Sequence, residues 1–210
     1  MSVYDLTIVP NSLQMSLETQ SALFPSPLIA SAQTLDRGGQ KWRAVLSYIN
    51  MTTADRATLM ALIARLRGQA HRVRIPAHDN PARGFYGGTP LVNGASQTGS
   101  TLNVDGVGTQ ANWIRAGDYF SVDVNGEHEL KMATTDADAS GGSITLNFEP
   151  RLRESPLNNA AIYVQDGSLP TPTGVFVLEG DTHGWSSKPW IDKPISDFQM
   201  RLIEDVFATQ

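Results

Sequence analysis

The sequence predicts a mainly β protein, with a β-sandwich-like domain that contains one α-helix and carries an inserted small β-barrel domain. Short apolar runs alternate with polar residues at the period of two that half-buried strands show. Nine of the 18 glycines fall between Gly84 and Gly126, where Asn-Gly and Asp-Gly steps favour tight turns. One stretch, from Thr52 to Gly68, has the period of an amphipathic helix.

The first strands are expected before residue 50. Leu13, Met15 and Leu17 alternate with polar residues and predict a half-buried strand. Pro25 and Pro27 then interrupt pairing, which suggests an edge or a corner. Two further strands, 29–35 and 41–49, are predicted to form a hairpin through the turn at residues 36–39. The second of them places one set of side chains on a single face, namely Trp42, Ala44, Leu46 and Tyr48.

The helix has signals at both ends. Thr52 is expected to be its N-cap, with Asp55 three residues later as a weak capping box. Gly68 is expected to end it, since glycine adopts the left-handed conformation found after helices. Its apolar stripe repeats at helical spacing, as Leu59, Leu62, Ile63 and Leu66. A short strand, 71–75, follows.

The pattern of strand and turn signals in the sequence changes after Pro76, and the earlier pattern returns near residue 170. Between these points short strands recur with turn signals between them, as a small barrel or sandwich requires. We therefore assign residues 77–169 to the inserted domain, and residues 1–76 with 170–210 to the first domain. The strands expected in the insert are 101–104, 119–124, 128–133, 143–148 and 161–165.

The C-terminal part has the same pattern as the first 76 residues, with an apolar strand expected at 175–179. Alternation over 196–202 favours a closing strand, while a helix continuing through Val206 is the competing interpretation. A loop between these segments carries Trp185 and Trp190, which either anchor an interface or cap the core.

Composition limits the function classes. A net charge of -5 and a pI near 5.3 argue against general nucleic-acid binding, and we expect no nucleic-acid sequence recognition. The chain contains no cysteine, which excludes disulfides, thiolate metal sites and a cysteine nucleophile. We see no signal peptide and no apolar run near the roughly 18 residues that a membrane span needs. We expect a soluble protein made in the cytosol.

No pattern predicts catalysis or metal binding. Asp136 to Gly141 resembles the start of a calcium loop, but Asn147 stands where such a loop needs a bidentate glutamate, so a solvated turn is favoured. No two histidines have helical ligand spacing, and the Ser96 region lacks the last glycine of a nucleophile elbow. We expect neither an enzyme nor a cofactor. The histidines are His71, His78, His128 and His183.

Four arginines form a basic cluster at the helix end and the following strand: Arg65, Arg67, Arg72 and Arg74. They are expected either to form a solvated face or to contact a partner subunit with a negative surface, because opposite potentials orient subunits. With Trp185 and Trp190 they are the candidate interface residues.

The order of these signals resembles a tail protein of long-tailed bacteriophages, most closely the distal tail protein. The resemblance spans almost the whole chain and rests on turn and strand phrases, with Leu102 and Trp113 among them. The phrases are QKWRAVL at 40–46, MTTAD at 51–55, LRG at 66–68, GTPLVNGASQTG at 88–99, AGDYF at 116–120 and PRLR at 150–153.

The resemblance implies a structural virion component without catalytic residues. Distal tail proteins form a homo-hexameric ring at the tail tip, joining the tail tube protein to the baseplate hub or tail fibre beside the tape-measure protein. Many carry a peripheral barrel of the oligonucleotide/oligosaccharide-binding (OB) type. The alternatives are another minor tail protein, or a carbohydrate-binding module that contacts a host-surface glycan through the insert. Candidate sugar-contacting aromatics in the insert are Phe85, Tyr86, Trp113, Tyr119 and Phe120.

Overall fold

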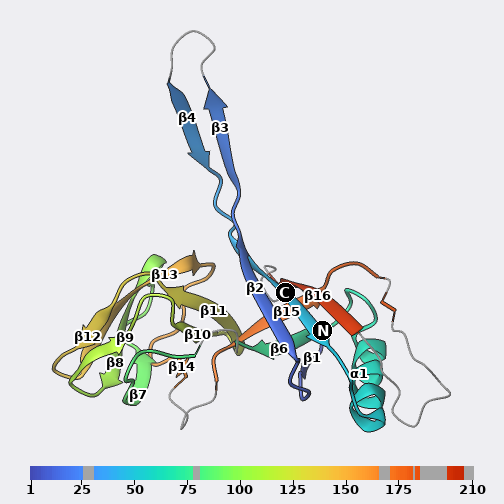
Figure 1. The fold of residues 1–210 in the computed structure, drawn as a ribbon. Coiled ribbons are helices and arrows are strands. Elements are labelled where there is room, and N and C mark those ends of the chain that lie inside the picture. The colour runs from blue at the N-terminus through green and yellow to red at the C-terminus, as the bar shows by residue number, and fades with distance from the viewer. Residues whose placement is uncertain (26–30, 78–80, 166–170, 182, 185–197, 206–210) are drawn as a thin grey trace.

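The computed structural model describes residues 1–25, 31–77, 81–165, 171–181, 183–184 and 198–205. The protein is mainly β, as predicted, and α1 is the one helix in these residues. A six-stranded sheet and a barrel-like sheet lie side by side, and a two-stranded arm extends away from both (Figure 1).

The first sheet has the order β1-β6-β15-β16-β5-β2. β1 is parallel to β6, and the other neighbours are antiparallel. β5 shows the predicted alternation, because Trp42, Ala44, Leu46 and Tyr48 are all buried. The bounds are β1 Val3–Asp5, β2 Ser12–Glu18, β5 Lys41–Tyr48, β6 Arg72–Pro76, β15 Thr173–Leu178 and β16 Phe198–Glu204.

The helix α1, Thr53–Leu66, covers part of the inner face of this sheet and confirms the prediction. Thr52 is the N-cap, and its hydroxyl oxygen accepts a hydrogen bond from Asp55 N at 3.1 Å. Leu59, Ile63 and Leu66 are buried against the sheet. Arg67 closes the helix in the left-handed conformation, and Gly68 follows with φ of 63°.

The closing strand is also confirmed, since β16 lies between β15 and β5 at the centre of the sheet. A helix is wrong for 198–204, while 196, 197 and Val206 lie outside the described residues. β16 alternates buried Phe198, Met200 and Leu202 with exposed side chains, as a strand with one buried face does.

The predicted hairpin between 29–35 and 41–49 is wrong. β4, Ala32–Asp36, pairs instead with β3, Ser21–Pro25, to form the arm, whereas β5 pairs with β2 and β16. Residues 36–39, read as a hairpin turn, lie where the arm joins the sheet. The physical reason is that β2 and β5 are longer and carry the apolar alternation, so they pair with each other in the sheet.

The second sheet has the order β14-β10-β11-β13-β8-β7. A bridge between Leu91 and Ala161 brings β7 back to β14, so the sheet is nearly closed into a barrel. Its bounds are β7 Gly88–Val92, β8 Gly99–Val107, β10 Tyr119–Val124, β11 Glu127–Ala133, β13 Ser143–Leu152 and β14 Ile162–Val164. β9, Gln110–Ile114, and β12, Ala137–Ala139, form a separate pair.

All five strands expected in the insert are present, whereas β7, β9 and β12 were not expected. The barrel has its own core, which includes Trp113, Phe120 and Phe148. Tyr119 and Leu130 face away from it and belong to the core of the first sheet. The barrel and α1 therefore both cover the inner face of that sheet, on opposite sides in Figure 1.

Candidate functional site

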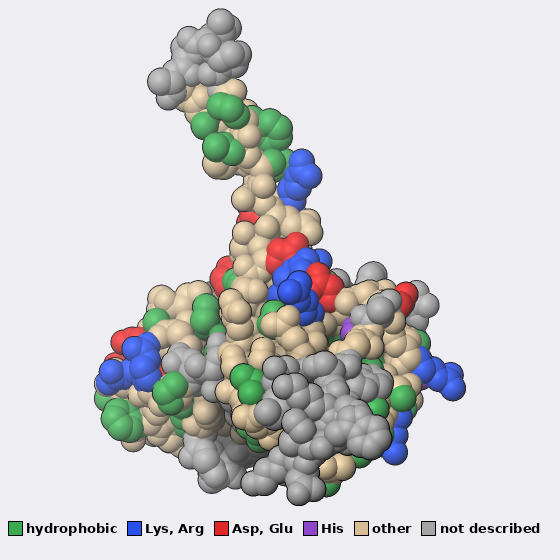
Figure 2. All heavy atoms as spheres, turned by 45° about the vertical axis from the view of Figure 1, so that its right-hand side comes forward, with side chains coloured by type: hydrophobic (Ala, Val, Ile, Leu, Met, Phe, Trp, Pro, Cys, Tyr) green, Lys and Arg blue, Asp and Glu red, His purple; other side chains and the backbone are tan. Residues whose placement is uncertain are grey.

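The most distinctive surface is the arm, formed by β3 and β4. Figure 1 shows it extending from the sheet, and Figure 2 shows hydrophobic side chains gathered along it. Leu23 is 63% exposed, Phe24 53% and Leu35 49%. No charged residue occurs between residues 19 and 35 of the sequence. An isolated two-stranded ribbon is marginally stable in water, so such a surface is typical of a segment that another chain covers.

The apolar side chains of the arm lie on both of its faces. Ala22 pairs directly with Leu35, and Phe24 is two residues further along the same strand, so Phe24 and Leu35 share a face. Leu23, which pairs with Thr34, points to the opposite face. A ribbon that lies flat on one surface leaves its other face in water. The arm therefore exposes apolar side chains on both of its faces.

Ion pairs hold the sheet strands from which the arm emerges. Arg43 Nε lies 2.5 Å from Glu18 Oε2, and Arg43 Nη1 lies 2.6 Å from Glu179 Oε1. The hydrogen bond that Arg43 donates to Glu18 lowers the pKa of Glu18. The same bond, together with the hydrogen bond to Glu179, raises the pKa of Arg43. These contacts link β2, β5 and the residue after β15 below the arm.

A network of charged side chains connects the barrel to the first sheet. Arg153, after β13, donates to both carboxylate oxygens of Glu204 on β16, at 3.0 and 2.6 Å. Trp42 N donates to the same carboxylate at 2.9 Å. Trp42 Nε1 donates to the carbonyl of Leu130 on β11, at 3.0 Å. Because Glu204 is 2% exposed, this carboxylate joins three elements inside the protein.

Lys131 on β11 extends this network into the barrel. Its side chain is fully buried, and its Nζ lies 2.7 Å from Glu129 Oε2 and 3.0 Å from the carbonyl of Arg151. Burial lowers the pKa of Lys131, while Glu129 opposes the shift. Buried charges are costly unless paired, so this network favours one arrangement of the two sheets.

The four candidate arginines separate into two environments. Arg65 and Arg67 are exposed at the C-terminal end of α1. Arg72 is buried and pairs with Asp205, and Arg74 Nη1 lies 3.1 Å from Asp5 Oδ1. The chain itself thus supplies acidic partners for Arg72 and Arg74. Trp185, Trp190 and His78 lie outside the described residues.

The calcium-like loop is held by hydrogen bonds within the protein. Asp136 Oδ1 accepts from Ala116 N at 2.8 Å, and Asp138 Oδ1 accepts from Asn112 N at 2.6 Å. Among the described residues no three His, Asp or Glu side chains are grouped as metal ligands would be. The carboxylates instead fix the chain around β9 and β12.

The three described histidines are far apart in the chain and have separate partners. His71 Nδ1 accepts from Ser2 N at 3.3 Å. His128 stacks on Tyr163 at 4.4 Å and its Nδ1 lies 2.6 Å from Thr173 Oγ1. Burial is the main cause that lowers the pKa of His128. His183 Nε2 lies 3.1 Å from Gly180 O.

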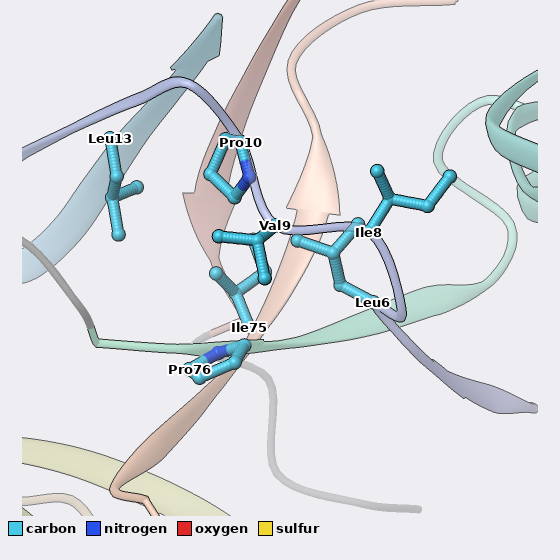
Figure 3. Close-up of a pocket in the computed structure, with 7 residues that line it drawn as sticks. All are labelled: Leu6, Ile8, Val9, Pro10, Leu13, Ile75 and Pro76. Carbon is cyan, nitrogen blue, oxygen red and sulfur yellow. The ribbon is translucent and has the colours of Figure 1, made fainter. Parts of the chain in front are cut away.

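One apolar recess lies beside the edge of the first sheet (Figure 3). Its free volume is about 30 Å³, which admits a small apolar group and no extended ligand. Its lining residues are Leu6, Ile8, Val9, Pro10, Leu13, Ile75 and Pro76.

The insert presents little aromatic surface for a sugar. Of the five candidate aromatics, Phe85 is 62% exposed. Trp113 and Phe120 are fully buried, and Tyr86 and Tyr119 are nearly so. Tyr86 donates to Asp118 Oδ2 at 2.9 Å, which ties its hydroxyl into the structure.

No protein-family model matches this chain, and a search of curated proteins gives no significant match. No helix among the described residues is long and apolar enough to cross a membrane.

Proposed function

We propose that this protein is a structural subunit of the tail tip of a long-tailed bacteriophage, a distal tail protein that forms a ring of about six copies. In this function it joins the tail tube protein to the baseplate hub or tail fibre, beside the tape-measure protein, and catalyses no reaction. In this function the protein is a component of the virion after synthesis in the host cytoplasm.

The arm is the observation that carries this proposal. A ribbon with Leu23 on one face and Phe24 and Leu35 on the other, whose strands carry a charge only at Asp36 at the base, is suited to burial between subunits. In addition, β1 and β2 are the edges of the first sheet and, among the described residues, have no strand beyond them. Free sheet edges pair readily with another chain, and a closed ring uses two different faces of each subunit.

Mass photometry and negative-stain microscopy of the purified protein test the proposal. We expect annular particles of about six times the chain mass of 22.8 kDa. Because a neighbouring tail protein can be required for ring formation, the same measurement is made after co-expression with the adjacent tail genes. Monomers under both conditions contradict the proposal.

Substitutions in the arm connect assembly to the structure. Replacing Phe24 and Leu23 with serine removes apolar groups from both faces and is expected to shift the particles to monomers. The matched control is Leu157→Ser, since Leu157 on the barrel is 64% exposed, as much as Leu23. Equal assembly of the arm variant and the control would show that the arm does not carry the subunit contacts.

A further inference from the structure

The joint between the arm and the sheet contains two consecutive glycines in the left-handed conformation. Gly38 has φ of 65° and Gly39 of 72°. Pairing between β2 and β5 ends at Glu18 and Lys41, and pairing of β3 with β4 begins at Ser21 and Asp36. The ribbon is therefore interrupted by two residues on one side and four on the other, where the chain can bend.

Few contacts of the arm's own strands bridge this interruption. Arg37 N donates to Gln20 O at 2.9 Å, and Gly38 N donates to Asp36 Oδ1 at 2.8 Å. Both bonds lie at the base of the arm and neither reaches the sheet, so they do not fix the angle between the arm and the sheet. Glycine has the widest conformational freedom of any residue, so a two-glycine joint needs an outside contact to hold one direction.

The barrel supplies such a contact through Arg151 on β13. A Cβ built on Gly38 would overlap the Arg151 guanidinium, with Cζ at 3.0 Å. The planar group thus lies directly against the Gly38 backbone, in the space that any other residue would fill. Gly39 differs, because a Cβ there would meet only Gln20, at 3.8 Å.

Arg151 is itself fixed to the protein on both sides. Its carbonyl accepts a hydrogen bond from the buried Lys131 Nζ at 3.0 Å. Two residues later, Arg153 binds both carboxylate oxygens of Glu204 on the first sheet. The backbone that carries Arg151 is therefore anchored, and only its side chain reaches the joint.

We propose that Arg151 is a latch: its side chain, carried by the anchored backbone of β13, packs on Gly38 and sets the direction in which the arm leaves the sheet. Displacing the side chain frees the two-glycine joint and lets the arm sample other directions. A contact that moves the end of β13 on the barrel consequently changes the direction of the arm. This inference goes beyond the proposed function and holds for a single chain, whether or not it forms a ring.

Distance measurement by pulsed electron paramagnetic resonance tests the latch. The chain has no cysteine, so Thr34→Cys on the arm and Thr101→Cys on the barrel, both exposed, give two unique spin-label positions. Labelled protein is diluted with unlabelled protein, which removes distances between copies. We expect a narrow distribution for the parent and at least a twofold broader one for Arg151→Ala.

Two glycine variants form a matched pair. Gly38→Ala pushes the Arg151 side chain away and is expected to broaden the distribution as Arg151→Ala does. Gly39→Ala bears comparable left-handed strain without touching Arg151, and is expected to stay narrow. The double variant Gly38→Ala/Arg151→Ala should be no broader than Arg151→Ala alone, because both changes remove one contact.

Arg201→Ala is the control for loss of an exposed arginine, since Arg201 lies on β16 away from the joint and its guanidinium bonds to Gln199 on the same strand. Circular dichroism verifies that each variant is folded. A broad parent distribution, an unchanged Arg151→Ala distribution, or equal broadening in Gly38→Ala and Gly39→Ala would each overturn the latch.

Discussion

Arg153 and Glu204 form a buried ion pair, and replacing Arg153 should destabilise the protein more than replacing Glu204. Arg153→Met leaves the Glu204 carboxylate, 2% exposed, with Trp42 N as its remaining donor among the bonds described above. Glu204→Gln leaves a guanidinium whose side chain is 20% exposed and can gain water. We therefore expect the loss of the arginine to cost more.

The magnitudes follow from the cost of breaking buried ion pairs. Removing one partner of such a pair typically costs 3–5 kcal/mol. For Arg153→Met we expect about 4 kcal/mol of unfolding free energy, and for Glu204→Gln about 3 kcal/mol, since partial hydration reduces the penalty. The double variant has no unpaired charge at this position, so it should lose about 3 kcal/mol instead of the sum of both.

Urea denaturation followed by circular dichroism and tryptophan fluorescence measures these differences. The matched control is Arg201→Met, because Arg201 is exposed on the same strand and should change stability by less than about 0.5 kcal/mol. Single variants as stable as this control, or a double variant equal to the sum of the singles, would refute the reasoning.

Two other predictions concern single side chains. Asp118 is 1% exposed and accepts hydrogen bonds from the backbone N–H groups of residues 83, 84 and 115 and from Tyr86. In Asp118→Asn the new amide N–H group faces one of these donors, so the variant should lose about 1–3 kcal/mol of unfolding free energy, measured in urea. Asp138→Asn, an exposed carboxylate with one backbone bond, is the control, and equal losses would contradict the prediction. Burial lowers the folded-state pKa of His128 below its ordinary value of 6.5, so the unfolded state binds more protons and stability should fall as pH drops through 6.5 toward the folded pKa. His128→Gln should flatten this dependence when unfolding is measured between about pH 7 and 5, and identical slopes would contradict it.

The sequence predicted those elements whose signals are local. The helix has its cap at Thr52 and its apolar stripe within 14 residues, so both could be recognised without knowing the sheet. β5 and β16 show alternation because one face of each is buried. β9 and β12 were missed because they have only five and three residues, too few for alternation with a period of two to be recognised.

The arm was missed because pairing partners are not a local property. Residues 29–35 were assigned to the nearest strand downstream, through a turn-like sequence that serves as the joint. One signal was available: residues 19–35 contain no charge although they are too polar and proline-rich for a core strand. Such a composition is more typical of an exposed arm than of a strand in the protein's own core.

The arginine cluster shows how pairing in the folded protein changes the interpretation of a basic pattern in the sequence. Arg72 and Arg74 alternate on β6, and each pairs with an acidic residue of the first sheet itself, Asp205 after β16 and Asp5 on β1. The barrel adds Glu127, whose carboxylate interacts with the nearby charges of Arg74 and Arg72. Burial raises the pKa of Glu127 despite the opposing effect of Arg74. Arg72 and Arg74 are therefore paired within the first sheet, beside Glu127 of the barrel, which leaves Arg65, Arg67 and the arm as the described candidates for contacts with other chains.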